Sequence, residues 1–142
     1  MSIEKESVKF LIRTKTGYHE PTYELKRMMA DKYKIGIGTF DLIKLPSQVS
    51  SSPLRKVPEK LLEKAVLIEV KSSARDINEN LKGFFFGYTY SEQLTAQKLG
   101  SKYKIAFVVI PKSGKKRFFK IMDPKRLWAK TKSANLVWHI SF

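Results

Sequence analysis

The chain has 142 residues, a length that fits a single domain over residues 1–142 with a buried core. Its composition, 42% hydrophobic and 29% charged, is typical of a globular protein and excludes a disordered one. The absence of cysteine excludes disulfides, thiolate zinc sites and cysteine nucleophiles. No apolar run reaches the roughly 18 residues of a membrane span, and the first residues lack the apolar core of a signal peptide. We therefore expect an intracellular, cytoplasmic protein.

The net charge is the strongest global feature of the sequence. Lys and Arg number 28 and Asp and Glu number 13, which gives a formal net charge of +15. Such an excess on a small domain favours a polyanionic partner, most often nucleic acid through phosphate contacts. An anionic membrane surface competes, but the sequence contains no strongly amphipathic basic helix of the kind that lies on bilayers. We expect nucleic acid as the partner and no membrane.

The first third of the chain predicts a strand, a helix and a second strand. Residues 8–13 are typical of a strand, and a helix is expected over 21–33, because its apolar residues recur at helical spacing. Glu24 falls in the first turn of that helix. It is either a carboxylate that interacts favourably with the helix dipole or a functional group. Residues 34–45 alternate as a strand, and Asp41 interrupts the apolar series on one of its faces.

A Ser/Pro-rich segment at 46–57 predicts a mobile loop, and a short helix over 58–64 leads into a strand that begins at Ala65. Side chains of a strand alternate between its two faces. One face of this strand carries Val66, Ile68 and Val70, and the other carries Leu67, Glu69 and Lys71. Two opposite charges on one face of a buried strand are either an ordinary ion pair or the parts of a site for a divalent cation and a phosphate.

After this strand comes a dense aromatic segment at 84–88, which is either a core strand or a partly exposed surface for stacking on bases. Thr89 and Glu92 have the spacing of a capping box, which predicts a helix that runs to about Leu99. Gln93 lies in its first turn. Its amide is either exposed to solvent or turned toward the preceding strand, where it could donate to a phosphate.

The last third of the chain predicts strands at 103–110 and 118–122, joined by a basic hairpin turn at 111–117. A helix is expected over 124–129, and a final strand over 136–142 either completes the core or forms a dimer interface. The order of elements predicts an α/β domain with a mixed central sheet of about five strands flanked by helices.

Asp41 and the charged pair of Glu69 and Lys71 lie on strands that follow one another, and sequential strands are often neighbours in a sheet. Two carboxylates, together with waters and phosphate oxygens, are the ligands that Mg²⁺ prefers. A lysine on the same face could orient the attacking water or neutralise charge that develops in the transition state. The sequence therefore predicts one site built from these three residues, provided that the two strands pair.

These residues resemble the PD-(D/E)xK nuclease superfamily, which has a restriction-endonuclease-like fold. Phe40-Asp41 is similar to the degenerate Pro-Asp of that superfamily, and residues 68–73 resemble its (D/E)-x-K strand. The helix that begins near Gln93 resembles the one that follows, and Glu24 could match the acidic residue of the first helix. The compact basic build and the segment 119–127 are most similar to archaeal Holliday-junction resolvases.

The resemblance implies a Mg²⁺-dependent endodeoxyribonuclease, with Mn²⁺ as a substitute, that works on branched DNA as a homodimer. The implied metal ligands are Asp41, Glu69, the carbonyl of Val70 and Glu24, with Glu20 as the rival of Glu24. Lys71 is the implied catalytic cation, and Gln93 a contact to phosphate or water. The candidate DNA contacts, which are otherwise solvated charges or turn-forming hydroxyls, are Ser72, Ser73, Arg55, Lys112, Lys115, Lys116 and Arg117.

A second hypothesis comes from a different functional class. The same scaffold could bind DNA or RNA without catalysis and use Glu69 and Lys71 as a structural ion pair. The two histidines, His19 and His139, are far apart in the sequence and no Cys accompanies them, so a zinc site is not expected.

Overall fold

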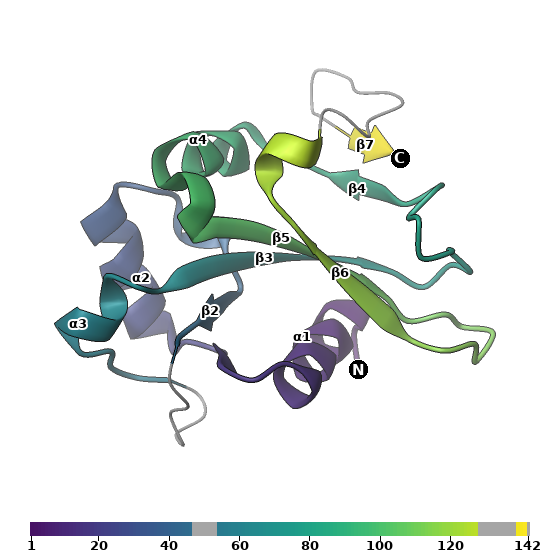
Figure 1. Ribbon diagram of the computed structural model, residues 1–142, viewed down its shortest axis with the longest axis horizontal. Helices are drawn as coiled ribbons and strands as arrows, with labels where there is room; N and C mark the ends of the chain where they lie inside the picture. The colour runs from purple at the N-terminus through teal and green to yellow at the C-terminus, as the bar shows by residue number, and fades with distance from the viewer. Residues whose placement is uncertain (47–53, 128–138, 142) are drawn as a thin grey trace.

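The computed structural model describes residues 1–46 and 54–127, and the backbone of 139–141. Its centre is a five-stranded sheet in the order β1-β2-β3-β5-β6 (Figure 1). β3 and β5 pair in parallel, and the other neighbours pair antiparallel. The strands are β1 (Tyr18–His19), β2 (Leu42–Lys44), β3 (Val66–Ser73), β5 (Tyr103–Val109) and β6 (Phe118–Met122). The predicted mixed sheet of about five strands is confirmed.

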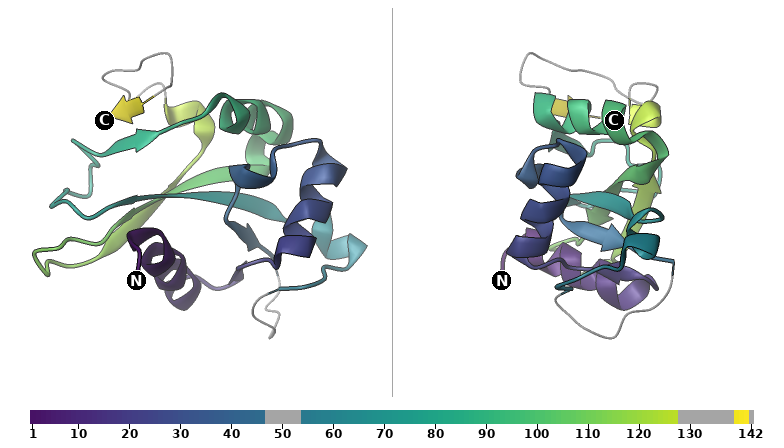
Figure 2. Two further views of the ribbon diagram at one scale, coloured as in Figure 1. Left: turned by 180° about the vertical axis from the view of Figure 1, so that it is seen from behind. Right: turned by 90° about the vertical axis from the view of Figure 1, so that its left-hand side faces the viewer.

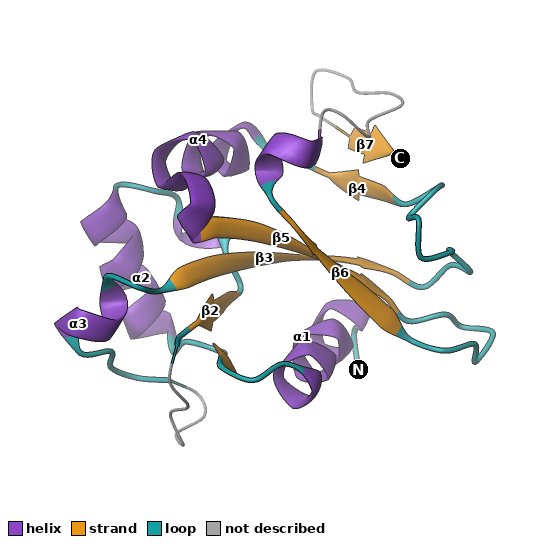
Figure 3. Ribbon diagram, in the orientation of Figure 1, coloured by secondary structure: helices purple, strands orange, loops and turns teal. Residues whose placement is uncertain are grey.

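A separate pair of strands, β4 (Phe85–Gly87) and β7 (His139–Ser141), lies beside the main sheet. Four α-helices and three short 3₁₀ turns complete the described structure (Figure 3). The α-helices are α1 (Ile3–Thr14), α2 (Tyr23–Tyr33), α3 (Glu59–Leu62) and α4 (Tyr90–Leu99). The 3₁₀ turns are η1 (Ile37–Thr39), η2 (Gly100–Lys102) and η3 (Pro124–Arg126).

Helices cover both faces of the sheet (Figure 2). Leu11 of α1 packs with one face, where it contacts a cluster that includes Ile68 and Val108. Met29 of α2 belongs to the cluster on the other face, and Leu99 of α4 packs against it. The predicted alternation of β3 is confirmed, because Ile68 and its face-mates lie toward α1 while Leu67, Glu69 and Lys71 lie toward α4.

The first element is a helix, so the prediction of a strand at 8–13 is wrong. α1 begins after Ser2, whose hydroxyl accepts a hydrogen bond from the Lys5 N–H at 3.3 Å. Ser7 and Leu11, four residues apart, are both fully buried on the sheet. The β-branched residues at 8–13 therefore fit a helix because their neighbours provide a cap and a buried stripe at helical spacing.

The prediction of a long strand at 34–45 is also wrong, because only Leu42–Lys44 is a strand. Before it the chain turns through η1, where the Thr39 hydroxyl donates to the Gly36 carbonyl at 2.6 Å. A Cβ at Gly36 would lie 2.6 Å from the Ser91 hydroxyl and 3.1 Å from the Thr39 methyl group, so the absence of a side chain lets this turn lie close to α4. As a result Asp41 lies just before β2 instead of within a strand.

Several other predictions of elements are confirmed. The helix expected at 21–33 is α2, whose cap is Thr22, and Thr89 and Glu92 form the predicted capping box of α4. The aromatic segment is mainly core, since Phe84, Phe86 and Tyr88 are buried while Phe85 is 56% exposed. The prediction at 124–129 differs from the structure, because its first residues, Pro124–Arg126, form a 3₁₀ turn. Parts of three expected elements lie outside the described residues. They are 47–53 of the loop, 128–129 of the helix, and 136–138 and 142 of the last strand.

Across the described ranges, no helix combines the length and the apolar composition needed to span a membrane.

Candidate functional site

Asp41 is fixed at an edge of β3. β2 pairs with β3 only as far as Ile68, and Asp41 comes immediately before β2. The Asp41 N–H donates to the Ile68 carbonyl at 2.7 Å, and the Val70 N–H donates to Asp41 Oδ2 at 2.8 Å. The N–H and C=O of one strand residue point to the same edge. The Val70 carbonyl therefore lies on the edge that Asp41 occupies.

A buried tyrosine stabilises the turn before Asp41. The Tyr103 hydroxyl donates to the Thr39 carbonyl at 2.5 Å, and both residues are buried. Burial, followed by the nearby acidic groups, raises the pKa of Tyr103, so its hydroxyl stays protonated and remains a donor. This hydrogen bond ties η1 to β5, and so it limits the movement of Asp41 relative to β3.

Glu69 is 7% exposed and lies next to Asp41. Burial is the largest cause that raises the pKa of Glu69 well above its ordinary value of 4.5, and the carboxylates of Asp41 and Glu92 raise it further. Lys71 opposes this shift only in part. Within the described residues, Glu69 Oε2 is a buried atom that accepts no hydrogen bond. Glu69 therefore keeps its proton to a higher pH than an exposed glutamate does.

Lys71 is held by Glu92 of α4. Its ammonium lies 2.9 and 3.0 Å from the two Glu92 oxygens and 3.9 Å from Glu69 Oε1. Glu92 Oε1 also accepts the Thr89 N–H at 3.0 Å in the capping box. The start of α4 and the charged end of β3 thus share one carboxylate, and the Lys71 side chain, 13% exposed, is fixed in position.

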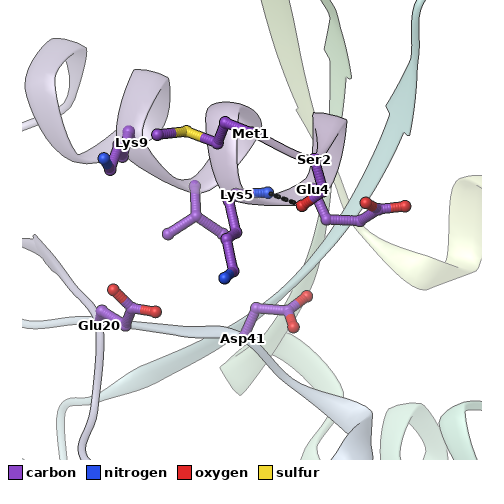
Figure 4. A pocket seen from close by; sticks show the side chains of 8 residues that line it. Met1, Ser2, Glu4, Lys5, Lys9, Glu20 and Asp41 are labelled. Carbon is purple, nitrogen blue, oxygen red and sulfur yellow. Dashed lines mark hydrogen bonds between the residues drawn. The ribbon is translucent and has the colours of Figure 1, made fainter.

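Asp41 also lines a pocket of about 720 Å³ that lies against the start of α1. Glu20 lies on the same pocket, and in Figure 4 the Lys5 side chain points toward the space between the Glu20 and Asp41 carboxylates. Glu24, the first-helix acid of the sequence analysis, is instead an exposed residue of α2 and does not line this pocket. Of the two candidate acids, Glu20 is the one that the structure brings to the pocket with Asp41.

The candidate DNA contacts are spread over several elements. The Ser72 hydroxyl donates to that of Ser7 at 2.8 Å and so ties β3 to α1, while the Ser73 hydroxyl accepts the Arg75 N–H at 3.2 Å in a turn. Gln93 is half-buried beside Glu92 on α4. The remaining candidates are exposed, namely Arg55 before α3 and Lys112, Lys115, Lys116 and Arg117 on the β5–β6 hairpin. Two of these hairpin cations are near acids: Lys115 lies 3.6 Å from Asp76, and Arg117 lies 3.8 Å from Glu6.

Sequence reasoning missed the role of Glu92. Its place in the capping box explained its side chain fully, so nothing in the sequence required a second partner for it. Its contact with Lys71 depends on how α4 packs on the sheet, which is tertiary information. The hydrogen bond of the Ser7 hydroxyl is missed for another reason, because the sequence pattern assigns residues 8–13 to a strand instead of to α1.

Within the described residues, no group of three or more His, Cys, Asp and Glu side chains is arranged as a metal site. Asp41 and Glu69 supply two carboxylates, and the Val70 carbonyl adds a third ligand group beside Asp41. Mg²⁺ takes few protein ligands and keeps several waters, so a site with this donor set suits it. The orphaned Glu69 Oε2 is an acceptor that such an ion would satisfy.

Comparison with known proteins adds no family to these observations. No protein-family model, no curated protein and no solved structure matches the chain significantly.

Proposed function

We propose that the chain is a Mg²⁺-dependent nuclease that hydrolyses phosphodiester bonds of DNA. The observation that carries the proposal is the convergence of Asp41 and Glu69 at one edge of β3, with the Lys71 ammonium 3.9 Å from Glu69. Oxygen ligands for a metal ion beside a fixed cation are groups that promote hydrolysis of a phosphodiester, because they stabilise charge that develops on the phosphate. The net charge of +15 supports a polyanionic substrate.

Asp41, Glu69 and the Val70 carbonyl would hold the ion, and Mn²⁺ should replace Mg²⁺ because it accepts the same oxygen ligands. When bound, the ion supplies charge that polarises the scissile phosphate and lowers the pKa of a ligating water. The chain fixes the ligands before the substrate arrives, since Asp41 is held by hydrogen bonds to β3. Ligand fixation of this kind reduces the reorganisation needed during the reaction.

Lys71 is the residue that orients the attacking water or neutralises charge on the phosphate. Glu92 holds its ammonium through both carboxylate oxygens, so the lysine is in place without substrate. Glu20 is the acid that can assist from the pocket side, and Gln93 can contact phosphate or water from α4. Each role is assigned to a side chain that lies on β3, on α4 or on the pocket next to Asp41.

One observation favours a different function. The contact between Lys71 and Glu92 is complete without a substrate, as expected of a structural ion pair. In that case the chain is a basic module that binds nucleic acid without cutting it, and the charged end of β3 serves only to attach α4 to the sheet.

Incubation with supercoiled, single-stranded and four-way-junction DNA, in Mg²⁺ or in EDTA, separates the two functions. The nuclease proposal expects cleavage in Mg²⁺ and in Mn²⁺, none in EDTA, and loss of at least 100-fold in rate for Asp41→Asn and for Glu69→Gln. Glu63→Gln, which removes an exposed carboxylate after α3, is the matched control and should cut like the wild type. Binding without cleavage, or cleavage that survives Asp41→Asn, would favour the non-catalytic module or another site.

The same substrates test the finer parts of the proposal. Preference for the four-way junction over a linear duplex is expected of an enzyme that acts on branched DNA, and symmetric cuts in two strands are expected of a homodimer. The sedimentation coefficient, measured with and without junction DNA, gives the oligomeric state directly.

A further inference from the structure

Two lysines form a wall of the pocket that contains Asp41. Lys5 and Lys9 lie four residues apart on α1, about 6 Å along the helix axis, and both line the pocket (Figure 4). Both are exposed, and within the described residues neither ammonium has an ion-pair partner. These two residues are called the lysine wall below. They contrast with Lys115 of the hairpin, which pairs with Asp76.

The lysine wall belongs to a helix that is packed firmly on the sheet. Ser7, between the two lysines, is fully buried and bonded to Ser72 at the end of β3. Leu11 is fully buried on the sheet, and Phe10 packs edge-to-face on Phe119 with ring centroids 5.9 Å apart. The face of α1 that carries the two lysines is therefore held at a fixed place relative to Asp41, as a binding surface requires.

The far side of the pocket is acidic. Glu20 and Asp41 lie across from α1, and the Lys5 ammonium points between them. A polyanion that enters this pocket meets repulsion from these carboxylates and attraction from the lysine wall. The attraction is strongest along the face of α1 that carries Lys5 and Lys9, although Glu4 of the same helix also lines the pocket. A divalent cation beside Asp41 would favour the approach by removing part of the repulsion.

We propose that the lysine wall binds the phosphodiester backbone of a DNA strand and guides it along α1 to Asp41. This inference rests on the proposed function and deepens it, because it names the path of the substrate strand. The lysine wall makes sequence-independent contacts, since each ammonium binds a phosphate and reads no base edge. Arg13, exposed one further turn along α1, continues the same row.

The test is binding of fluorescently labelled single-stranded and duplex DNA in EDTA, measured by anisotropy at several salt concentrations. Lys5→Gln/Lys9→Gln should weaken binding by about 10-fold or more near 100 mM salt and lower the slope of log K against log salt by about two, one for each lost phosphate contact. The matched control is Lys60→Gln/Lys64→Gln, which removes two exposed charges at the same spacing near α3, away from this pocket. Thermal melting of all three proteins checks that the variants fold.

The outcomes distinguish the inference from the function on which it rests. A smaller slope for the lysine-wall variant, with the control close to wild type, supports the proposal. Equal losses of DNA affinity in the two variants, or no loss in either, would overturn the proposed role of the lysine wall. The nuclease proposal would stand if the wild type still binds and cuts DNA. Failure of the wild type to bind DNA, together with binding to anionic phospholipid vesicles, would overturn both.

Discussion

Replacement of Glu69 by Gln gives a prediction in which stability and function change in opposite directions. Glu69 is buried beside Asp41 and Glu92, which together with burial raise its pKa above 4.5. In the folded protein it keeps its proton to a higher pH than in the unfolded chain. Unfolding then releases a proton, and the free energy of unfolding falls as the pH rises from the unfolded pKa toward the folded one.

The size of this effect follows from linkage. If the folded pKa of Glu69 lies above 7, the protein loses about 1.4 kcal/mol per pH unit above 4.5, or about 2.5 kcal/mol between pH 5 and pH 7. Glu69→Gln keeps the shape of the side chain but has no proton to lose. The variant should therefore be more stable than the wild type at pH 7, and its advantage should grow by about that amount between the two pH values.

Urea unfolding in EDTA at pH 5, 6 and 7 measures this difference, and Glu63→Gln controls for loss of an exposed carboxyl group. Taking the variant minus the wild type cancels groups that both proteins share, including His19, whose pKa is lowered by burial. The same variant should lose the stabilisation that Mg²⁺ gives the wild type, because a ligand that binds only the folded state stabilises it. A difference that stays constant with pH would refute the account of Glu69 as a buried acid with a raised pKa.

Three further predictions concern the supports of the site and of the fold. Tyr103→Phe leaves the buried Thr39 carbonyl without its hydrogen-bond donor. The free energy of unfolding should therefore fall by about 1–3 kcal/mol, and DNA cleavage should slow. An unchanged midpoint of urea unfolding would contradict this prediction. Glu92→Gln keeps an acceptor for the Thr89 N–H but removes the negative charge that fixes Lys71. The kcat for DNA cleavage should therefore fall about 10-fold or more, while DNA affinity in EDTA stays unchanged. A loss of affinity without a loss of kcat would contradict this prediction. Gly17→Ala puts a Cβ 2.5 Å from the Leu45 backbone oxygen, at a residue with φ +87°. Thermal melting should show that the free energy of unfolding falls by about 1–3 kcal/mol. The DNA affinity of the protein that remains folded should not change.

The parts of the site on β3 could be predicted from the sequence because they depend on local alternation. The period of two placed Glu69 and Lys71 on one face, and the tendency of sequential strands to pair placed Asp41 next to them. Both are rules about neighbours in the chain or in the sheet. The capping box of α4 was predicted for the same reason, since its two residues are only three positions apart.

The parts that could not be predicted depend on contacts between elements that are distant in sequence. β-branched residues at 8–13 favoured a strand, whereas the Ser2 cap and the burial of Ser7 and Leu11 on the sheet explain the helix. Residues 34–45 fitted a strand pattern, but Ile37–Thr39 form a 3₁₀ turn that lies close to α4. The choice between Glu20 and Glu24 required the position of α1, which the wrong first element concealed.

The central claim is that Asp41 and Glu69 share a divalent cation with the Val70 carbonyl. Anomalous diffraction from crystals soaked in Mn²⁺ tests it most directly, because the ion is located without reference to activity. The account predicts one strong peak within bonding distance of oxygens from these three residues, and its loss in the Asp41→Asn protein. A saturated Mn²⁺ peak elsewhere, with these oxygens bound only to water or protein, would contradict the claim.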